Sequence, residues 1–297
     1  MKINNSKILV VLAFFAIYVI WGSTYLFNKI AVTELPPFFL ASIRFISAGA
    51  LIMIIAKCLK FKIAITKKQF LNTLIAGFLF LVYGNGVFVW ALRYVDSGFA
   101  ALLAATQPLF VLFLMRLIDR KSMQKKSIIG VLLGFLGMYL LVSQKNIATS
   151  EGSALGIFMI FTCVLSWSYG SVFVSKADLP KNFFVSTGYQ MLTAGTLLFF
   201  GSILFKETWV SPLDWSEDVK LSMAFLIFFG GIVAFTSFNY LLKNVSTEKV
   251  ATSAYINPII AMLLGWYVLD ERFSLQSIIA SVVLLTGVYF INSRKRR

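Results

Sequence analysis

Long apolar runs separated by short charged clusters recur along almost the whole chain. Ten such runs lie near residues 8–28, 36–56, 69–92, 97–115, 127–143, 154–175, 183–205, 221–242, 249–269 and 274–292. Each is close to the roughly 20 residues that an α-helix needs to cross a bilayer. Ten spans of this size would occupy about 200 of the 297 positions, which leaves only short connections. We therefore expect an all-α integral membrane protein with ten transmembrane helices.

Composition excludes several kinds of chemistry. Hydrophobic residues make up 59% of the chain and charged residues 13%, whereas soluble domains average about 45–50% and about 25%. Histidine is absent, and Cys58 and Cys163 are the only cysteines, so the commonest general base, thiolate metal clusters and disulfide scaffolds are excluded. We predict no catalytic residue, no metal site and no cofactor. The first apolar run is too long for a signal-peptide core, so we expect it to remain in the mature protein.

Lysine and arginine are distributed unevenly between the two sets of connections. About 20 of the 27 basic residues fall on the side of the N-terminus, and basic residues accumulate on the cytoplasmic side of membrane proteins. We therefore expect a multi-pass protein of the cell (inner or plasma) membrane with both termini in the cytoplasm. The basic clusters at 57–68, 116–126 and 294–297 are expected to contact anionic membrane lipids. Nucleic-acid binding requires basic residues gathered on one water-exposed face. Here they lie between apolar segments, so we expect no nucleic-acid binding.

The chain also resembles itself. Residues 94–143 align with 244–293 without a gap, and a shift near 146 pairs Trp21 with Trp167. The coinciding residues include Pro108/Pro258, Gly137/Gly287 and Tyr139/Tyr289. We predict a duplication with one five-helix repeat in residues 1–146 and another in 147–297. Because five is odd, the repeats are inverted, an architecture of secondary transporters whose substrate site lies at the repeat interface.

Two prolines and two amides are the best candidates for a solute pathway. Pro108 and Pro258 fall near the middles of the fourth and ninth runs, where each is expected to interrupt its helix. Gln107 and Asn257 precede them, so the inverted repeat would bring two amides toward one central region. We predict that these amides bind substrate; bonding between neighbouring helices is the alternative.

Aromatic and polar side chains recur at helical spacing and offer flat faces with one polar group, which suits amphipathic substrates. Membrane aromatics are also packing residues and interfacial anchors, so that alternative stays open. The predicted substrate-binding residues of this kind are Tyr18, Trp21, Tyr83, Trp90, Trp167, Asn239 and Tyr240.

Arg44 lies about 12 Å inside the second run, counting about 1.5 Å for each residue. A charge at that depth is costly and points to a functional site. It would bind a substrate carboxylate or hold helix-terminal carbonyls. Since no acid lies comparably deep and long arginine side chains can reach the interface, we favour the structural role.

The sequence resembles the drug/metabolite transporter superfamily, in particular its EamA-type branch of ten-span carriers. The residues that carry the resemblance extend over essentially the whole chain: Trp21-Gly22-Ser23, Pro36-Pro37, Arg44-Phe45, Ala91-Leu92-Arg93-Tyr94-Val95, Gln107-Pro108-Leu109, Asn257-Pro258-Ile259 and Asp270-Glu271-Arg272-Phe273. The family usually repeats a Gly-Glu-Arg-like turn after the fourth span, but here that turn reads Asp119-Arg120-Lys121. The resemblance implies transport of small organic metabolites, often amino acids or drug-like compounds, and often as efflux.

We therefore predict a secondary transporter that exports small organic solutes by alternating access. An integral-membrane enzyme and a non-transporting membrane scaffold are the alternatives. No Asp, Glu or His lies deep in a predicted span, so obligate proton coupling is not supported. Gly130, Gly134 and Gly137 would permit close helix packing, either within the chain or in a homodimer.

Overall fold

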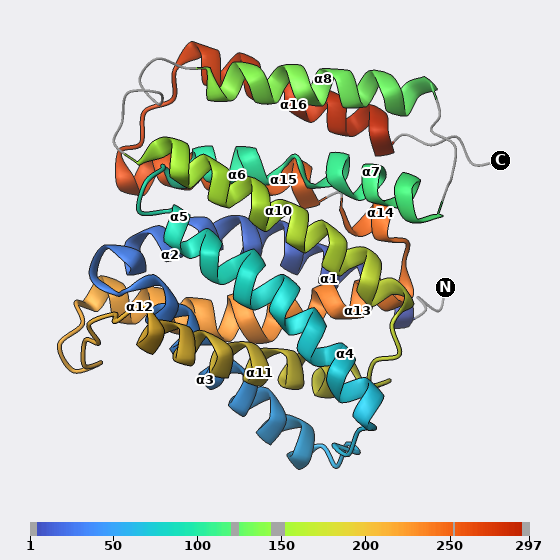
Figure 1. Ribbon diagram of the computed structural model, residues 1–297, viewed down its shortest axis with the longest axis vertical. Coiled ribbons are helices and arrows are strands. Elements are labelled where there is room, and N and C mark those ends of the chain that lie inside the picture. Colours follow the sequence, from blue (N-terminus) through green and yellow to red (C-terminus); the bar gives the residue numbers. More distant parts are fainter. Residues whose placement is uncertain (1–4, 120–124, 144–151, 252, 293–297) are drawn as a thin grey trace.

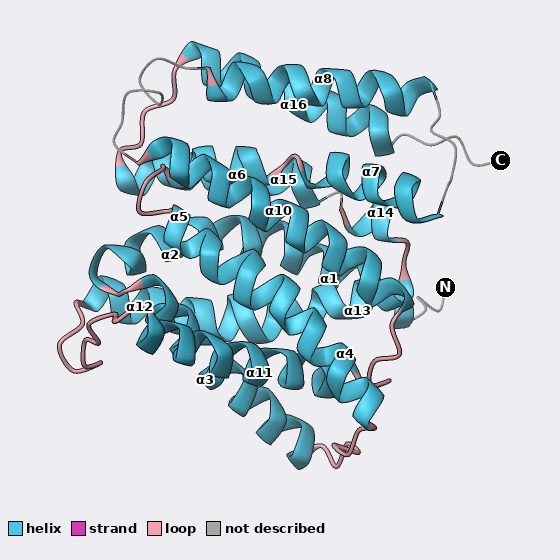
Figure 2. Cartoon of the chain, viewed as in Figure 1, coloured by secondary structure: helices cyan, strands magenta, loops and turns pink. Residues whose placement is uncertain are grey.

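The structure is a computed structural model that describes residues 5–119, 125–143, 152–251 and 253–292. Within these residues the regular elements are helices, and no strand occurs (Figure 2). In the same ranges, seven helices are long and apolar enough to cross a membrane, and shorter apolar helices cover Ile128–Val142, Ile256–Leu269 and Leu275–Gly287. The expected all-helical integral membrane protein is thus confirmed, while the count of ten spans stays a prediction.

Ten elements precede the undescribed segment 144–151: α1 (Asn5–Phe15), η1 (Ala16–Ile20), α2 (Trp21–Glu34), α3 (Pro37–Cys58), α4 (Lys67–Gly77), η2 (Phe78–Val87), α5 (Phe88–Ala91), α6 (Ser97–Ala104), α7 (Gln107–Asp119) and α8 (Lys125–Val142). Eight follow it: α10 (Ser153–Lys176), α11 (Phe183–Leu204), α12 (Glu217–Phe225), η3 (Leu226–Phe235), α13 (Thr236–Asn244), α14 (Thr247–Val250), α15 (Ser253–Leu269) and α16 (Leu275–Asn292). The η elements are π-helical and run without interruption into the α-helices beside them.

The helices lie side by side in one bundle, with the connections gathered at its two ends (Figure 1). Helix α8 packs along α16 and helix α3 along α11, and these are the two most extensive helix contacts. The two pairs occupy opposite ends of the long axis, and the other helices lie between them (Figure 1). Helix α1 begins and helix α16 ends on the right of the view (Figure 1). We call the opposite end, which carries the 205–216 connection, the distal end.

Small residues set the distance between α8 and α16. A Cβ atom on Gly137 would lie 2.6 Å from the backbone nitrogen of Leu284, and one on Gly287 would lie 2.6 Å from that of Gly134. Side chains at either position would push the two helices apart. The glycines of the fifth predicted span therefore pack within the chain, one of the two roles expected for them.

Polar side chains define where several helices begin. Thr66 and Gln69 form a reciprocal capping box at the start of α4. The side chain of Asn182 accepts hydrogen bonds from Phe184 and Val185 at the start of α11. These contacts satisfy amide donors of the first helical turn, which have no partner within the helix.

The predicted spans match the helices to within a few residues, with two informative differences. The first helix was expected to end near residue 28 but continues to Glu34. The charge of Lys29 does not stop it, because the Lys29 ammonium donates to the backbone oxygens of Leu92 and Val95 at 2.7 and 2.8 Å. The partly buried Lys29 ammonium thereby has two acceptors where the helix passes it.

The second difference concerns the two prolines. Pro108 is the second residue of α7, a first-turn position where no amide donor is needed, and the helix is interrupted just before it at Ala105 and Thr106. Pro258 instead lies inside α15, which continues through it. The expected interruption at Pro258 is therefore wrong, since its missing amide removes only one bond of a helix that neighbouring helices support.

Candidate functional site

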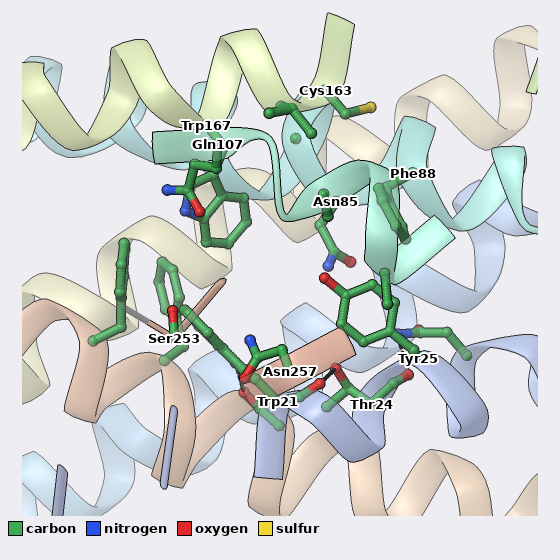
Figure 3. Close-up of a pocket in the computed structure, with 18 of the residues that line it drawn as sticks. Trp21, Thr24, Tyr25, Asn85, Phe88, Gln107, Cys163, Trp167, Ser253 and Asn257 are labelled. Carbon is green, nitrogen blue, oxygen red and sulfur yellow. Dashed lines mark hydrogen bonds between the residues drawn. The ribbon is translucent and has the colours of Figure 1, made fainter. Parts of the chain in front are cut away.

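A cavity lies in the middle of the bundle, and helices from both halves of the chain enclose it. Its volume is about 120 Å³, and since one water needs about 10–15 Å³, a small organic molecule fits. Its described lining comes from α2, α3, η2, α5, α6, α7, α10, η3, α13, α14 and α15. The closely paired α8 and α16 contribute none of it. Figure 3 shows the lining side chains converging on one space.

Aromatic rings from four elements form one wall. Trp21 on α2 and Trp167 on α10 meet edge to face, with centroids 5.6 Å apart and planes at 83°. The ring of Phe238 on α13 lies 4.9 Å from that of Trp21 and 5.7 Å from that of Trp167, and Phe235 on η3 completes the group. The indole nitrogen of Trp21 donates to the Gly230 oxygen at 3.3 Å. Trp21 and Trp167, which occupy equivalent positions in the two predicted repeats, thus meet at one surface.

A single charged side chain lies in the described lining. Arg44 is only 3% exposed, and its Nη1 donates to the side-chain oxygens of Asn28 and Asn85 at 3.2 and 3.3 Å. Asn28 is itself oriented by a bond from its Nδ2 to the Thr24 oxygen at 2.7 Å. The guanidinium carbon lies 4.9 Å from the ring centre of Phe45. The two asparagines therefore hold a positive charge at the edge of the cavity without neutralising it.

The two predicted amides also reach the cavity. Gln107 lines it, and its side chain makes no hydrogen bond within the described part of the chain. With its nitrogen turned toward the surrounding acceptors, the Asn257 amide donates to the backbone oxygens of Tyr18, Ile17 and Ser253 at 2.8, 2.9 and 3.2 Å. Asn257 thus joins α15 to the π-helical turn of the first helix, whereas Gln107 is available to a ligand.

Two π-helical segments bring backbone close to the cavity. Gly84 of η2 and Gly230 of η3 both line it. A Cβ atom on Gly84 would lie 3.0 Å from the ring of Trp167, and one on Gly230 would lie 3.2 Å from Nη2 of Arg44. These glycines allow the two side chains to take their places. Such π-helical turns often occur at functional sites.

Six of the twelve predicted site residues line the cavity, namely Trp21, Arg44, Gln107, Trp167, Asn257 and Pro258. The other six lie elsewhere, namely Tyr18, Tyr83, Trp90, Pro108, Asn239 and Tyr240. Tyr83 was placed on the cavity face by α-helical spacing. Because η2 winds by a different period, the residues that face the cavity here are Leu81, Gly84 and Asn85 instead.

The remaining predicted residues have packing partners. Trp90 meets Phe38 and Phe205 at the distal end, with ring centres 5.3 Å apart in both pairs. The Asn239 amide donates to the Thr187 hydroxyl at 3.2 Å and accepts from Gln190 at 3.3 Å, which joins α13 to α11.

The two tyrosines in this group also pack against aromatic rings. Tyr240 packs against Phe183 with ring centres 5.3 Å apart. Tyr18 lies 5.5 Å from Phe14.

The structure also identifies lining residues that the sequence did not single out. Asn85, Phe235, Phe238, Cys163 and Ser253 all contribute to the cavity. A signal for Asn85 existed, because it is a polar residue between two glycines within an apolar run. Within the described segments, no group of three or more His, Cys, Asp or Glu residues comes together that would hold a metal ion.

Comparison with known proteins gives consistent matches along the chain. The model of the EamA-like transporter family matches residues 8–143 and 154–293. The uncharacterized inner membrane transporter YedA of Escherichia coli (strain K12) is 35% identical over 290 residues, which cover 95% of this chain and 92% of that protein. The uncharacterized transporter YoaV of Bacillus subtilis (strain 168) is 20% identical over 290 residues, covering 97% and 99% of the two chains.

The fold also matches a solved crystal structure. The two chains superpose with a TM-score of 0.70 and 19% sequence identity, and the match covers 95% of each chain. At this level of identity the likeness establishes the fold alone.

Proposed function

The chain belongs to the EamA-like transporter family, and we propose that it is a secondary transporter that exports small organic metabolites, such as amino acids or drug-like compounds, by alternating access. The observation that carries this proposal is the central cavity, whose walls combine aromatic faces with the polar groups of Asn85, Gln107 and Ser253. Small-molecule sites are lined in this way. Export is the direction that the family resemblance favours.

The proposed architecture is ten spans arranged as two inverted five-helix repeats, residues 1–146 and 147–297. Three observations support it. The family model matches two consecutive segments. The second predicted span packs on the seventh (α3 on α11), and the fifth on the tenth (α8 on α16). Finally, the third and eighth predicted spans each contain a ten-residue π-helical segment, η2 and η3.

We further propose that the protein resides in the inner membrane with both termini in the cytoplasm. The inner membrane location of YedA in its name supports the first point. The concentration of lysine and arginine on the side of the termini supports the second.

Counterflow in proteoliposomes tests the proposal. Vesicles containing the purified full chain are preloaded with an unlabelled amino acid or aromatic metabolite, and uptake of the labelled compound is followed. We expect saturable uptake that the internal compound accelerates. A membrane enzyme would convert the compound without moving it, a scaffold would do neither, and a channel would show no acceleration by internal substrate.

A matched pair of variants ties the flux to the cavity. Ala104 lines it, and Ala154 on α10 is exposed. Ala104→Trp should fill the cavity and abolish uptake, whereas Ala154→Trp should leave uptake unchanged. Equal uptake by both variants would contradict the assignment of the cavity as the substrate path.

A further inference from the structure

We infer that the substrate of the central cavity is an amphipathic organic carboxylate whose negative charge pairs with Arg44. This inference rests on the proposed transport function and names the class of compound that would be carried. Three observations support it: the hydrogen bonds that Arg44 makes, the absence of a carboxylate in the described cavity lining, and the aromatic wall of the same cavity.

Arg44 is a buried charge without a counter-charge among the residues that the structure describes. Its side chain is 3% exposed, and no carboxylate lies in the described lining of the cavity. Burying an unpaired guanidinium is costly, and removing charge from water is compensated only by close pairing and well-formed hydrogen bonds. An acidic ligand would supply the missing counter-charge, which explains why a charge is present at this depth without an acid beside it.

The bonds that Arg44 does make are weak for a guanidinium. Its two bonds, to Asn28 and Asn85, are 3.2 and 3.3 Å long and both come from Nη1. Charge-assisted bonds are typically about 2.7–2.9 Å. Nε is buried without an acceptor, and Nη2 donates no hydrogen bond within the described segments.

The unused donors lie along one edge of the guanidinium. Nε and Nη2 present two parallel N–H groups, the arrangement that a carboxylate accepts with both oxygens. Gly230, which has no side chain, stands beside Nη2, where a Cβ atom would come within 3.2 Å. Nε is buried in this conformation. Bidentate pairing with a carboxylate therefore requires a small rotation of the Arg44 side chain, which would break its two weak hydrogen bonds.

Neighbouring groups would complete the anion site. Only the oxygen of the Asn85 amide is engaged among the described residues, which leaves its nitrogen to donate. In Figure 3 Asn85 and Tyr25 point into the same part of the cavity from opposite walls. Both offer hydrogen-bond donors, and carboxylates accept several such bonds.

The other part of the cavity determines the rest of the ligand. The aromatic wall built on Trp21 and Trp167 lines the same space as Arg44. Flat apolar surface favours an apolar or aromatic group. The ligand that satisfies both regions is thus a small acid with an apolar or aromatic body.

Matched acids and amides test the inference. The purified full chain in detergent is titrated with acetate, isovalerate, phenylacetate and indole-3-acetate and with the amide of each, and ligand binding is read from the rise in melting temperature. We expect the larger acids to bind at least about tenfold more tightly than their amides. If no acid binds better than its amide, or if acetate binds as tightly as the larger acids, the inference is overturned.

Three variants that each remove one positive charge or add one negative charge identify the site. Arg44→Gln removes the guanidinium, and Asn85→Asp keeps it but supplies a carboxylate beside it. Lys62→Gln changes an exposed residue between α3 and α4 and serves as the charge-matched control. The first two should lose the preference for acids, and the control should keep it. Because Asn85→Asp adds a counter-charge, it tests the inference even if Arg44→Gln fails to fold.

Transport of the same pairs separates this inference from the proposed function. If amides and acids move equally well in proteoliposomes, the carboxylate site is overturned and the carrier stands. If the acids bind to Arg44 but no compound moves, the transport function is overturned and the binding site stands.

Discussion

Glu271 and Ser97, 174 positions apart in the sequence, form a close contact at the distal end of the bundle. Glu271 Oε1 accepts hydrogen bonds from the backbone amide of Ser97 at 2.8 Å and from its hydroxyl at 2.7 Å, and Oε2 accepts one from the amide of Gly98 at 3.0 Å. These amides begin α6 and have no partner within the helix. A carboxylate from the second half of the chain thus caps the N-terminus of α6 in the first half.

A second carboxylate makes a similar contact nearby. Glu207 accepts hydrogen bonds from the amides of Phe38 and Phe39 at 3.0 and 2.8 Å, at the start of α3. In both cases the second half of the chain supplies the acid and the first half the helix. A conformation in which the halves separate at the distal end must break these bonds.

Replacing Glu271 by glutamine should therefore weaken the distal contact. The neutral amide has one acceptor oxygen where the carboxylate has two, and it loses the attraction of a negative charge to a helix N-terminus. We expect Glu271→Gln to lower the free energy of unfolding by about 1–3 kcal/mol, measured by denaturation in detergent.

Glu217→Gln is the control for this prediction, because Glu217 is exposed and pairs with its neighbour Lys220. It should change stability by less than about 0.5 kcal/mol. Equal destabilisation by both substitutions would show that the distal contact contributes nothing specific.

Asp96, at the distal end, should make the stability of the protein depend on pH. Partial burial and the nearby Glu271 raise the pKa of Asp96 above its usual value of 3.8, and Lys29 opposes this shift. Between pH 3.8 and the raised pKa, the folded protein binds more protons at Asp96 than the unfolded protein, so stability falls as the pH rises through this window. Asp96→Asn should remove this loss and raise the melting temperature slightly at neutral pH.

The gain from Asp96→Asn should shrink as the pH falls toward 4, where the carboxyl itself is protonated. The side chain of Asp96 makes no capping hydrogen bond with α6, so asparagine loses none. Melting curves of the two proteins from pH 4 to 8 test the sign. A gain that grows at low pH would contradict the stated direction of the pKa shift.

Much of the fold could be predicted from the sequence because hydrophobic runs and basic clusters report helices and their ends directly. The end of the first helix was missed, because the partners of Lys29 are the oxygens of Leu92 and Val95, over sixty positions away. The effect of Pro258 was also missed. A helix continues through a proline when its surroundings support it, and those surroundings are not local in sequence.

The candidate site could be predicted only in part. Trp21, Trp167, Gln107 and Asn257 were found because the repeat pairs them. Tyr83 was not placed correctly with respect to the cavity, because the π-helical winding of η2 changes which side chains share a face. The groups that surround Arg44 come from helices that are distant in sequence. Its lack of a carboxylate partner therefore emerged only from the structure, and the sequence favoured a structural role for it.

The aromatic wall makes a prediction about selectivity. Trp21→Ala removes a ring that contacts both Trp167 and Phe238 and should weaken binding of aromatic ligands by about 1–2 kcal/mol more than that of small aliphatic ones. Competition with labelled substrate in counterflow measures this difference.

Trp21→Phe is the matched variant. It keeps an aromatic ring but loses the pyrrole part of the indole and the hydrogen bond to Gly230, so it should retain most of the preference for aromatic ligands. An equal loss for all ligands in Trp21→Ala would assign the residue to packing.

The two amides should behave differently. Asn257 donates to the backbone oxygens of Ile17 and Tyr18, so Asn257→Ala removes these hydrogen bonds between α15 and η1 and should cost about 1–3 kcal/mol of stability. The Gln107 side chain makes no such bonds with the described residues, so Gln107→Ala should raise KM with stability changed by less than about 0.5 kcal/mol. Parallel melting and transport measurements separate the two effects. A large loss of stability in Gln107→Ala would contradict its assignment as a free ligand-binding group.

Cys163 provides a native reporter of the charge in the cavity. It lines the cavity, where it is 1% exposed and its thiol donates to the Tyr83 backbone oxygen at 3.2 Å, so a reagent reaches it when this contact opens. In a Cys58→Ser background it is the only thiol of the chain. A negatively charged sulfonate reagent should modify it about three- to tenfold faster than a positively charged trimethylammonium reagent, because the charge of Arg44 attracts the first and repels the second. The ratio is compared with that for a free thiol in solution. Both reagents require the same thiolate, so the ionisation of Cys163 cancels from the ratio. Adding Arg44→Gln should return the ratio to the free-thiol value, whereas an unchanged ratio would mean that Arg44 does not set the potential of the cavity.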